Sequence, residues 1–336
     1  MFILHASQRP GTLNNNNDSS SRLDVGRLLT AADTARLVKD EYEIQQIRRA
    51  NEISTLAHTR VFETIGRLTN EREIEGMFLD VCISHGAKRQ AYPIIAPAGA
   101  NIANLHYSRN QGPLNKGTQL VCVDAGAEWE NYASDVTRTF PRQGSWPSAE
   151  ARDIYKLVER VQEECIAATR VGVRMVDLQT MAQQSIIRGL LELGILKGGD
   201  MLELFMAGVA TVFFMHGLGH FVGLEVHDVG TYGSPGTTSL PMNDRFRPWT
   251  VGVPFEEGMV ITIEPGVYFS RLVLERVKTH PTLAKYIDFD VYERYLPVGG
   301  VRIEDDLLVT RYGYENLTTT PKGEEMLGII RKGVWQ

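Results

Sequence analysis

The 336-residue sequence predicts an α+β fold. Amphipathic helical patterns occupy residues 40–86 and 148–194, whereas residues 90–140 and the chain from 215 onward carry shorter apolar runs separated by glycine- and proline-rich turns, as strands do. Helices and strands are grouped and do not alternate regularly, as they would in a doubly wound sheet. Hydrophobic residues make up 43% of the chain, which is enough for a sizeable core.

The first 36 residues differ in composition from the rest. Residues 14–21 form a run of asparagine, aspartate and serine that cannot bury enough apolar surface to order itself. We therefore expect residues 1–36 to be a disordered or remnant segment and residues 37–330 to form one folded domain. The first eight residues lack the basic start of a signal peptide, and no apolar stretch approaches the ~20 residues that cross a bilayer.

Composition indicates a cytoplasmic protein that does not bind nucleic acid or membranes. The three cysteines are isolated within apolar runs, which is typical of free thiols in a reducing compartment. The chain has 35 basic and 41 acidic residues, a formal charge of -6, so it lacks the basic footprint of a nucleic-acid-binding protein.

The helices have recognisable starts and ends. Asp40 is expected to cap the first long helix, and Glu43, three residues later, completes a capping box. The following helices are expected from Thr69 to Gly86, from Ser148 to Gly172 and from Asp177 to Gly194.

Three predicted strands each end in a carboxylate. They are Leu120–Asp124, Ile261–Glu264 and Val301–Glu304. In each strand the valines or isoleucines point to one face and the terminal carboxylate to the other, because side chains alternate along a strand. Arg302 shares the face of Glu304.

A further strand is expected over Trp129–Phe140, with Gly126 before it, and it carries Asp135. The midpoint between Asp124 and Asp135 falls at Trp129–Glu130, so a hairpin centred there would set the two carboxylates side by side across the ladder. Two unpaired carboxylates at that range repel, and a nearby cation relieves the repulsion. A solvated residue or a salt-bridge partner is the alternative for any one of these acids.

Histidines gather in one short segment. His216 and His220 are four residues apart, and His227 follows seven residues later. Gly217 and Gly219 argue against a helix here and indicate backbone packed closely against something, such as a ligand. A core histidine bonded to a carbonyl is the alternative for each. His106 is a further candidate.

Several acids with one or two imidazoles favour hard divalent cations. Four carboxylates need two ions for charge balance, and a two-metal site suits hydrolysis. The sequence lacks the His-Glu-x-x-His helix of zinc proteases, the Gly-x-Ser-x-Gly motif, a P-loop and a dinucleotide-binding fingerprint.

At these residues the chain resembles the pita-bread metallopeptidases, in the branch of Xaa-Pro aminopeptidases and prolidases. The likeness runs from about Leu37 to about Thr320. Its motifs are residues 123–126 with Asp135, 216–228, 263–266 and 301–306. The resemblance implies a pita-bread fold, with a curved, mostly antiparallel sheet flanked by helices.

The resemblance also implies a metal site that holds two Mn²⁺ ions. Its ligands would be Asp124, Asp135, His220, Glu264 and Glu304. Asp124 would bind one ion, Asp135 and Glu304 would bridge both, and the other two residues would complete the shells.

Further roles follow from the same resemblance. Glu264 would handle the proton of the attacking water, and His216 and His227 would steady the substrate and its tetrahedral intermediate. The substrate-pocket positions would be His106, Arg302 and Tyr268, with Arg245 or Arg247 as a clamp for a substrate carboxylate.

The implied activity is that of an exopeptidase that hydrolyses the Xaa-Pro bond of small peptides, including Xaa-Pro dipeptides. A prolyl nitrogen carries no hydrogen, so a site that polarises the carbonyl suits this bond better than one that needs an N–H donor. A strict Xaa-Pro dipeptidase, a non-catalytic pita-bread binding module and metal-free creatinase-type hydrolysis are the alternatives.

Full-length members of this branch carry a creatinase-like domain ahead of the catalytic one, and it helps to build their dimer. Here about 36 residues precede Leu37. We expect a chain with that domain largely missing, and a homodimer is a possible assembly.

Overall fold

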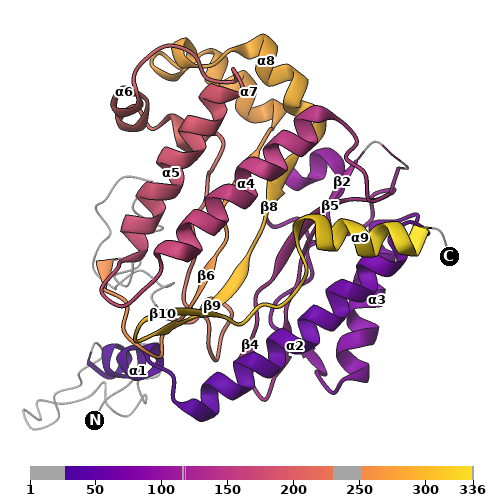
Figure 1. Cartoon of the computed structure of the whole chain (residues 1–336), viewed down its shortest axis with the longest axis vertical. Helices are drawn as coiled ribbons and strands as arrows, with labels where there is room; N and C mark the ends of the chain where they lie inside the picture. Colours follow the sequence, from indigo (N-terminus) through magenta and orange to yellow (C-terminus); the bar gives the residue numbers. More distant parts are fainter. Residues whose placement is uncertain (1–26, 116, 118, 230–251, 335–336) are drawn as a thin grey trace, which may run out of the picture.

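The computed structural model describes residues 27–115, 117, 119–229 and 252–334, and its elements are grouped as the sequence predicts (Figure 1). The helices are α1 (Arg27–Leu37), α2 (Glu41–Thr64), α3 (Glu71–Ser84), α4 (Ala149–Ala168), α5 (Met175–Glu192), α6 (Met201–Met206), α7 (Arg271–Lys278), α8 (Phe289–Tyr295) and α9 (Gly323–Val334). The strands are β1 (Arg89–Gln90), β2 (Leu120–Asp124), β3 (Ala127–Trp129), β4 (Tyr132–Ala133), β5 (Thr137–Pro141), β6 (Val260–Ile263), β7 (Gly266–Tyr268), β8 (Gly300–Arg302), β9 (Asp305–Thr310) and β10 (Gly313–Asn316).

The predicted helix starts are confirmed. Asp40 caps α2 in a capping box with Glu43, and Ser148 caps α4. Helix α3 follows Thr69 as expected, and its cap, Asn70, forms its own capping box. Each box satisfies backbone N–H groups that the first helical turn leaves without a partner.

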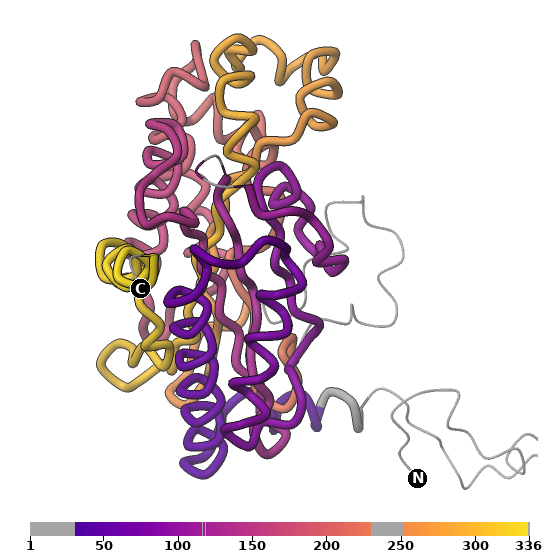
Figure 2. Tube along the Cα trace, turned by 90° about the vertical axis from the view of Figure 1, so that its right-hand side faces the viewer, coloured from indigo at the N-terminus to yellow at the C-terminus, as the bar shows by residue number. Residues whose placement is uncertain are grey.

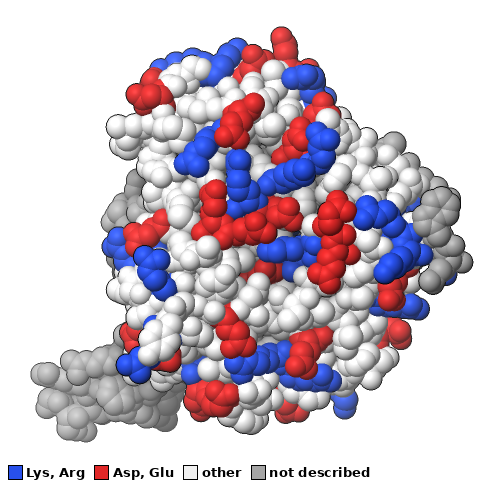
Figure 3. Space-filling view, viewed as in Figure 1, with Lys and Arg blue, Asp and Glu red and all other residues white. Residues whose placement is uncertain are grey.

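The strands form short antiparallel sheets that continue into one another. Their orders are β1-β3-β4, β10-β9-β6, β2-β5 and β7-β8. Isolated bridges join them: Thr137 pairs with Glu304, and Ile95 with Asp124. Helices α4, α5 and α9 lie on the same face of these strands (Figures 1 and 2). Acidic and basic side chains are interspersed over that face (Figure 3).

The register of the central hairpin differs from the prediction. Asp124 pairs with Thr137, not Asp135, and β3 pairs with β4 so that Trp129 is opposite Tyr132. The turn is therefore Glu130–Asn131, and both residues have positive φ, at 48° and 70°. Positive φ at both central residues is typical of a type I′ turn, whose twist matches that of the strands. The turn also ends the strand that was expected to run unbroken from Trp129 to Phe140.

The same register places Asp135 opposite Gly126. A Cβ at Gly126 would lie 1.8 Å from the Ser134 carbonyl oxygen, so only glycine allows the two backbones to approach this closely. Asp124 and Asp135 are consequently diagonal neighbours on one face of the ladder.

The last third of the chain is less purely β than expected. Its described residues form the helices α7, α8 and α9 as well as five strands. In α9 the buried side chains Met326, Leu327 and Ile330 follow helical spacing, and in α8 Tyr292 and Tyr295 are three residues apart. These short patterns lie among turn residues, which hides their period.

Helix α1 covers residues 27–36 of the segment expected to be disordered or a remnant. Its C-terminal residue, Leu37, is buried in the main core. Among the described residues, no helix combines the length and the apolar character needed to cross a membrane.

Candidate metal centre

The five predicted ligand residues meet at the ends of strands from distant parts of the chain. Among the described residues, Asp124, Asp135 and Glu304 offer oxygen atoms that all lie within 4.8 Å of one another. His220, Glu264 and Glu304 form a second such group, and Asp135 joins His220 and His227 in a third. Glu304 and Asp135 each belong to two groups, so the cluster is continuous.

Backbone pairing fixes the positions of these side chains. Glu304 lies between β8 and β9, and its N–H donates to the Thr137 carbonyl at 3.0 Å. Glu264 directly follows β6, and its N–H donates to the Leu218 carbonyl at 2.7 Å. The end of strand β6 therefore positions Glu264 and is hydrogen-bonded to the backbone of the histidine segment.

The histidine segment is not helical, as its glycines predict. A Cβ at Gly219 would lie 2.0 Å from the Thr262 carbonyl oxygen, so this glycine packs against strand β6 and not against a ligand. The Thr262 N–H donates to the His220 carbonyl at 2.8 Å. The close approach of the two backbones sets His220 beside Glu264.

A tyrosine that the sequence analysis missed joins the first two aspartates. The Tyr92 hydroxyl oxygen lies 2.6 Å from Asp124 Oδ1 and 2.5 Å from Asp135 Oδ1. Its single proton is shared between two carboxylates that would otherwise repel. Burial, followed by the charges of Asp124 and Asp135, raises the pKa of Tyr92 well above its ordinary value.

Arg302 lies behind the cluster and is 4% exposed. Its Nη2 donates to Asp124 Oδ2 at 2.6 Å, and its Nη1 donates to the Tyr268 hydroxyl at 2.9 Å. These contacts suit an arginine that orients a ligand carboxylate. Its expected contact with substrate stays a prediction.

His216 and Tyr268 form one hydrogen-bonded unit. The Tyr268 hydroxyl accepts from Arg302, so its proton is directed to His216 Nε2 at 2.8 Å. The other ring nitrogen, Nδ1, lies 2.8 Å from the Gly217 carbonyl oxygen and donates to it. Burial, followed by the charge of Arg302, lowers the pKa of His216 to about 3, so the ring is neutral near pH 7.

Asp135, Glu264 and Glu304 hold protons more tightly than they would in water. Burial and the neighbouring carboxylates raise the pKa of Glu304 well above 4.5 and that of Glu264 to about 7. His220 Nε2 lies 3.3 Å from Asp135 Oδ2 and 3.4 Å from Glu264 Oε1. Although burial opposes the charge, the hydrogen bond with Asp135 and the charge of Glu264 raise the pKa of His220 to about 9.

These pKa shifts have a common cause: several carboxylates are buried close to one another. A proton or a metal cation relieves it. The donors are carboxylate oxygens with one imidazole nitrogen, a set that fits hard divalent cations.

The remaining predicted residues lie around this cluster. His227 is exposed, and its ring centroid lies 4.1 Å from that of His220. His106 is exposed in the turn after the 3-10 helix Gly99–Ala103, and its contact with substrate stays a prediction. The proposed clamps Arg245 and Arg247 lie outside the described residues.

Two further contributors were missed. The Thr137 hydroxyl donates to Glu304 Oε2 at 2.6 Å, and Asp306 Oδ2 accepts the Asp135 N–H at 2.9 Å. Strand alternation could have identified Thr137, which lies two residues after Asp135 on the same face. No local pattern in the sequence indicates Tyr92.

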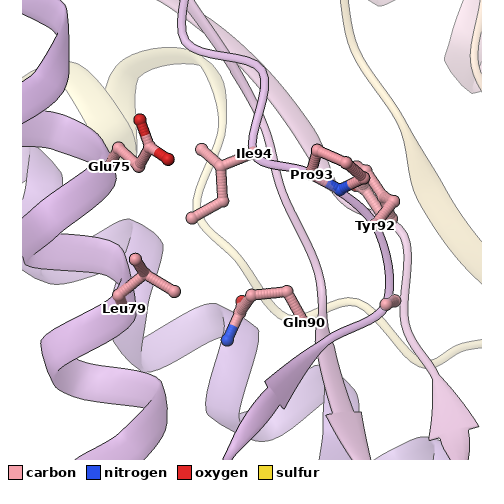
Figure 4. A pocket seen from close by; sticks show the side chains of 7 residues that line it. Glu75, Leu79, Gln90, Tyr92, Pro93 and Ile94 are labelled. Carbon is pink, nitrogen blue, oxygen red and sulfur yellow. The ribbon is translucent and has the colours of Figure 1, made fainter. Parts of the chain in front are cut away.

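A surface pocket of about 420 Å³ lies beside the centre, between α3 and residues 90–94. Figure 4 shows Glu75 and Leu79 on the helix side, facing Gln90 and Ile94. Tyr92 belongs both to this pocket and to the cluster, but none of the five predicted ligands lines it.

Comparisons with known proteins identify the family. Residues 45–311 match Metallopeptidase family M24. The chain is 56% identical over 338 residues to a probable Xaa-Pro aminopeptidase of Aspergillus niger, covering 99% of this chain and 68% of that protein. A probable Xaa-Pro aminopeptidase of Aspergillus fumigatus is 56% identical over 343 residues, covering 99% of this chain and 69% of its own length.

Solved structures show the same fold. Escherichia coli aminopeptidase P with the inhibitor Pro-Leu superposes with a TM-score of 0.76 at 35% identity, over 91% of this chain and 62% of that one. A glutamate-to-alanine variant of the same enzyme in complex with substrate gives the same values. The chain therefore spans less than two thirds of these solved chains. The likeness confirms the pita-bread fold, and the chain belongs to metallopeptidase family M24.

Proposed function

We propose that this chain is a metal-dependent exopeptidase that releases the N-terminal residue from peptides with proline in the second position. The observation that carries the proposal is the convergence of four carboxylates and one histidine within two overlapping groups of ligand atoms. Relatives named probable Xaa-Pro aminopeptidase, 56% identical over nearly the whole chain, support the choice of substrate.

Membership of a metallopeptidase family supports divalent cations at this centre. The residues that would hold them are Asp124, Asp135, His220, Glu264 and Glu304. Glu304 is common to the two groups made of proposed ligands, which supports a bridging role for it, and we assign the same role to Asp135. Manganese as the metal, two ions per chain and a homodimer stay predictions.

When bound, such ions polarise the carbonyl of the scissile bond and lower the pKa of water. The protein's own groups supply the rest. Glu264, whose carboxylate is crowded by others, is suited to take the proton of the attacking water and return it to the leaving proline nitrogen. An amide nitrogen leaves as an amine only after it gains a proton, and the prolyl nitrogen carries no hydrogen of its own in the substrate.

His216 and His227 each lie beside one of the proposed ligands, Glu264 and His220 respectively. Glu264 Oε2 is 3.7 Å from His216 Nδ1, and the His227 ring packs on that of His220. We assign both histidines to the stabilisation of the tetrahedral intermediate. Exposed His106 is placed to contact the rest of the peptide.

The proposal is tested by peptide hydrolysis with manganese supplied. Ala-Pro, Ala-Pro-Ala and Ala-Ala-Ala are incubated with the protein, with and without a chelator, and released alanine is measured. Cleavage of both proline peptides is expected, without cleavage of Ala-Ala-Ala or any activity under the chelator. Cleavage of Ala-Pro alone would identify a strict dipeptidase. If no peptide is cleaved, the result would favour the alternative of a non-catalytic binding module.

A matched pair of variants tests the metal ligands. Asp135→Asn removes a charge from the cluster, whereas Asp80→Asn removes one from an exposed position on α3. Only the first should lose bound metal, measured by elemental analysis, together with at least about a hundredfold in kcat/KM. Full activity and full metal content in Asp135→Asn would show that this residue is not a ligand.

A further inference from the structure

We propose that Lys39 and Arg36 are positioning residues for the reaction, because they hold the loop of residues 221–228 and thereby His227 against His220. The inference rests on the proposed function, since it assigns to that reaction two residues outside the metal centre. Both lie at the entry to the folded domain, nearly two hundred residues before the loop in sequence.

The contact between the two segments is a buried ion pair. Lys39 Nζ lies 2.9 Å from Asp228 Oδ2, and each of the two side chains is 1% exposed. Arg36 donates from Nε to the other oxygen, Oδ1, at 3.1 Å. The Asp228 carboxylate is therefore bound on both oxygens by cations from the entry segment. A buried carboxylate that loses such a partner moves toward water or takes up a proton.

Arg36 also reaches the tip of the loop. Its Nη2 lies 3.5 Å from Glu225 Oε2, in addition to its contact with Asp228 at the base. The Arg36 guanidinium thus contacts both the base and the tip of the loop. The tip residues, Leu224 and Glu225, are exposed.

The loop is shaped around this ion pair. The Asp228 N–H donates to the Phe221 carbonyl at 2.9 Å, which closes the base. A Cβ at Gly223 would lie 2.5 Å from Asp228 Oδ2 and 3.0 Å from Lys39 Cε. Any other residue at position 223 would displace the carboxylate or the lysine, so the glycine makes room for the pair.

The entry segment is itself fixed to the strand that leads into the metal centre. The Lys39 N–H donates to the Gly258 carbonyl at 2.9 Å, and Val38 forms a bridge with Met259, immediately before β6. Strand β6 leads directly to Glu264, a proposed catalytic carboxylate. Lys39 therefore connects the loop to the strand that positions this carboxylate.

His227 depends on this arrangement because it immediately precedes Asp228. Its backbone belongs to the loop, and its ring packs on that of His220, at 4.1 Å between centroids. A displacement of about 1 Å in a group that acts on the transition state costs up to about a hundredfold in rate.

A double-mutant cycle separates positioning from a general loss of structure. The variants are Lys39→Met, His227→Ala and their combination. The control is Arg48→Met, which removes the long-range ion pair of α2 with Glu315 on β10, at 2.7 Å. We expect Lys39→Met to lower kcat about 10- to 100-fold with KM changed less than about threefold. Adding it to His227→Ala should then lower kcat by no more than about threefold further.

Independent losses that multiply in the double variant would overturn the proposal, as would an unchanged kcat in Lys39→Met. Arg48→Met should leave kcat within about twofold of the unmodified chain. If the unmodified chain and Arg48→Met cleave no Xaa-Pro peptide, the proposed function has failed, whatever Lys39 does.

A second variant and a second measurement cover the case in which Lys39→Met does not fold. Arg36→Met changes a partly exposed side chain and should show the same non-additivity with His227→Ala at a smaller amplitude. Hydrogen–deuterium exchange of the full chain provides a readout that needs no turnover. Peptides spanning 221–228 should exchange faster in Arg36→Met and Lys39→Met but not in Arg48→Met, and unchanged exchange in both variants would refute the positioning role.

Discussion

His58 provides a stability prediction whose size follows from the structure. This histidine on α2 is 0% exposed, its Nε2 contacts the Ala125 carbonyl at 3.2 Å, and its Nδ1 has no hydrogen-bond partner among the described residues. Its ring also packs edge-on against Phe78. Burial, followed by the charge of Arg138, lowers its pKa from 6.5 to about 3. The folded chain therefore keeps His58 neutral at pH values where the unfolded chain protonates it.

The sign and magnitude follow from proton linkage. The contribution of neutral His58 to stability is fully present above pH 6.5 and is lost as pH falls toward about 3. Between pH 8 and pH 5 only the unfolded state takes up this proton. The effect accumulates over the 1.5 pH units between 6.5 and 5. At about 1.36 kcal/mol per pH unit, the free energy of unfolding falls by about 2 kcal/mol.

The substitution His58→Gln isolates this effect, because glutamine can donate to Ala125 and does not titrate. Free energies of unfolding are measured by urea denaturation at pH 8, 7 and 5 for both proteins. The unmodified chain should lose about 2 kcal/mol more than the variant between pH 8 and 5, and the two should run nearly parallel between pH 8 and 7. Equal losses in the two proteins down to pH 5 would show that His58 titrates normally in the folded state.

Two other perturbations address the metal centre and the loop beside it. Chelation of the manganese-loaded protein should lower Tm by about 5–10 °C, because ligands of the folded state stabilise it by mass action; an unchanged scanning-calorimetry transition would contradict a folded-state site. Glu71→Gln should lower the free energy of unfolding, measured by urea denaturation, by about 2–4 kcal/mol. The buried carboxylate accepts from the Ala98 and Gly112 N–H groups and from the Tyr107 hydroxyl. The amide nitrogen of glutamine would replace one of its oxygens and face the donors that this oxygen now accepts from. A cost below about 1 kcal/mol would show that the His106 loop is not held by this carboxylate.

Much of the fold could be predicted because it depends on local signals, whereas the set of five proposed ligands was implied by the resemblance to the pita-bread metallopeptidases. Capping boxes at Asp40 and apolar spacing define helices wherever they occur, and side-chain alternation decides the face on which Asp124 lies. The glycines around His220 excluded a helix correctly. Such features are set by neighbours in sequence and are recognisable without any long-range contact.

The features that the sequence did not predict depend on a turn or on distant partners. The hairpin register was wrong because the turn lies at Glu130–Asn131, one residue later than symmetry about the two aspartates suggests. Tyr92 was missed because its role arises only when residue 92 meets two carboxylates from the other strands. Short helices such as α8 were hidden because two buried tyrosines give too little periodicity to identify.

Charge balance in the cluster bears on the number of ions that the protein holds. The four carboxylates carry four negative charges, and Arg302, which contacts Asp124 at 2.6 Å, supplies one positive charge. One divalent ion would leave the cluster with a net charge of -1, whereas two would bring it to +1. A net positive charge favours a carbonyl oxygen that gains negative charge in the transition state.

The balance therefore favours two ions in the active protein, and elemental analysis beside the rate gives a direct comparison. Activity that rises only with the second equivalent of manganese would agree with the charge argument. Full activity at one ion per chain would contradict it. In that case a bound proton would have to supply the remaining positive charge. If His220 Nε2 held that proton, it could not also be a metal ligand, because a proton and a metal ion compete for the same nitrogen lone pair.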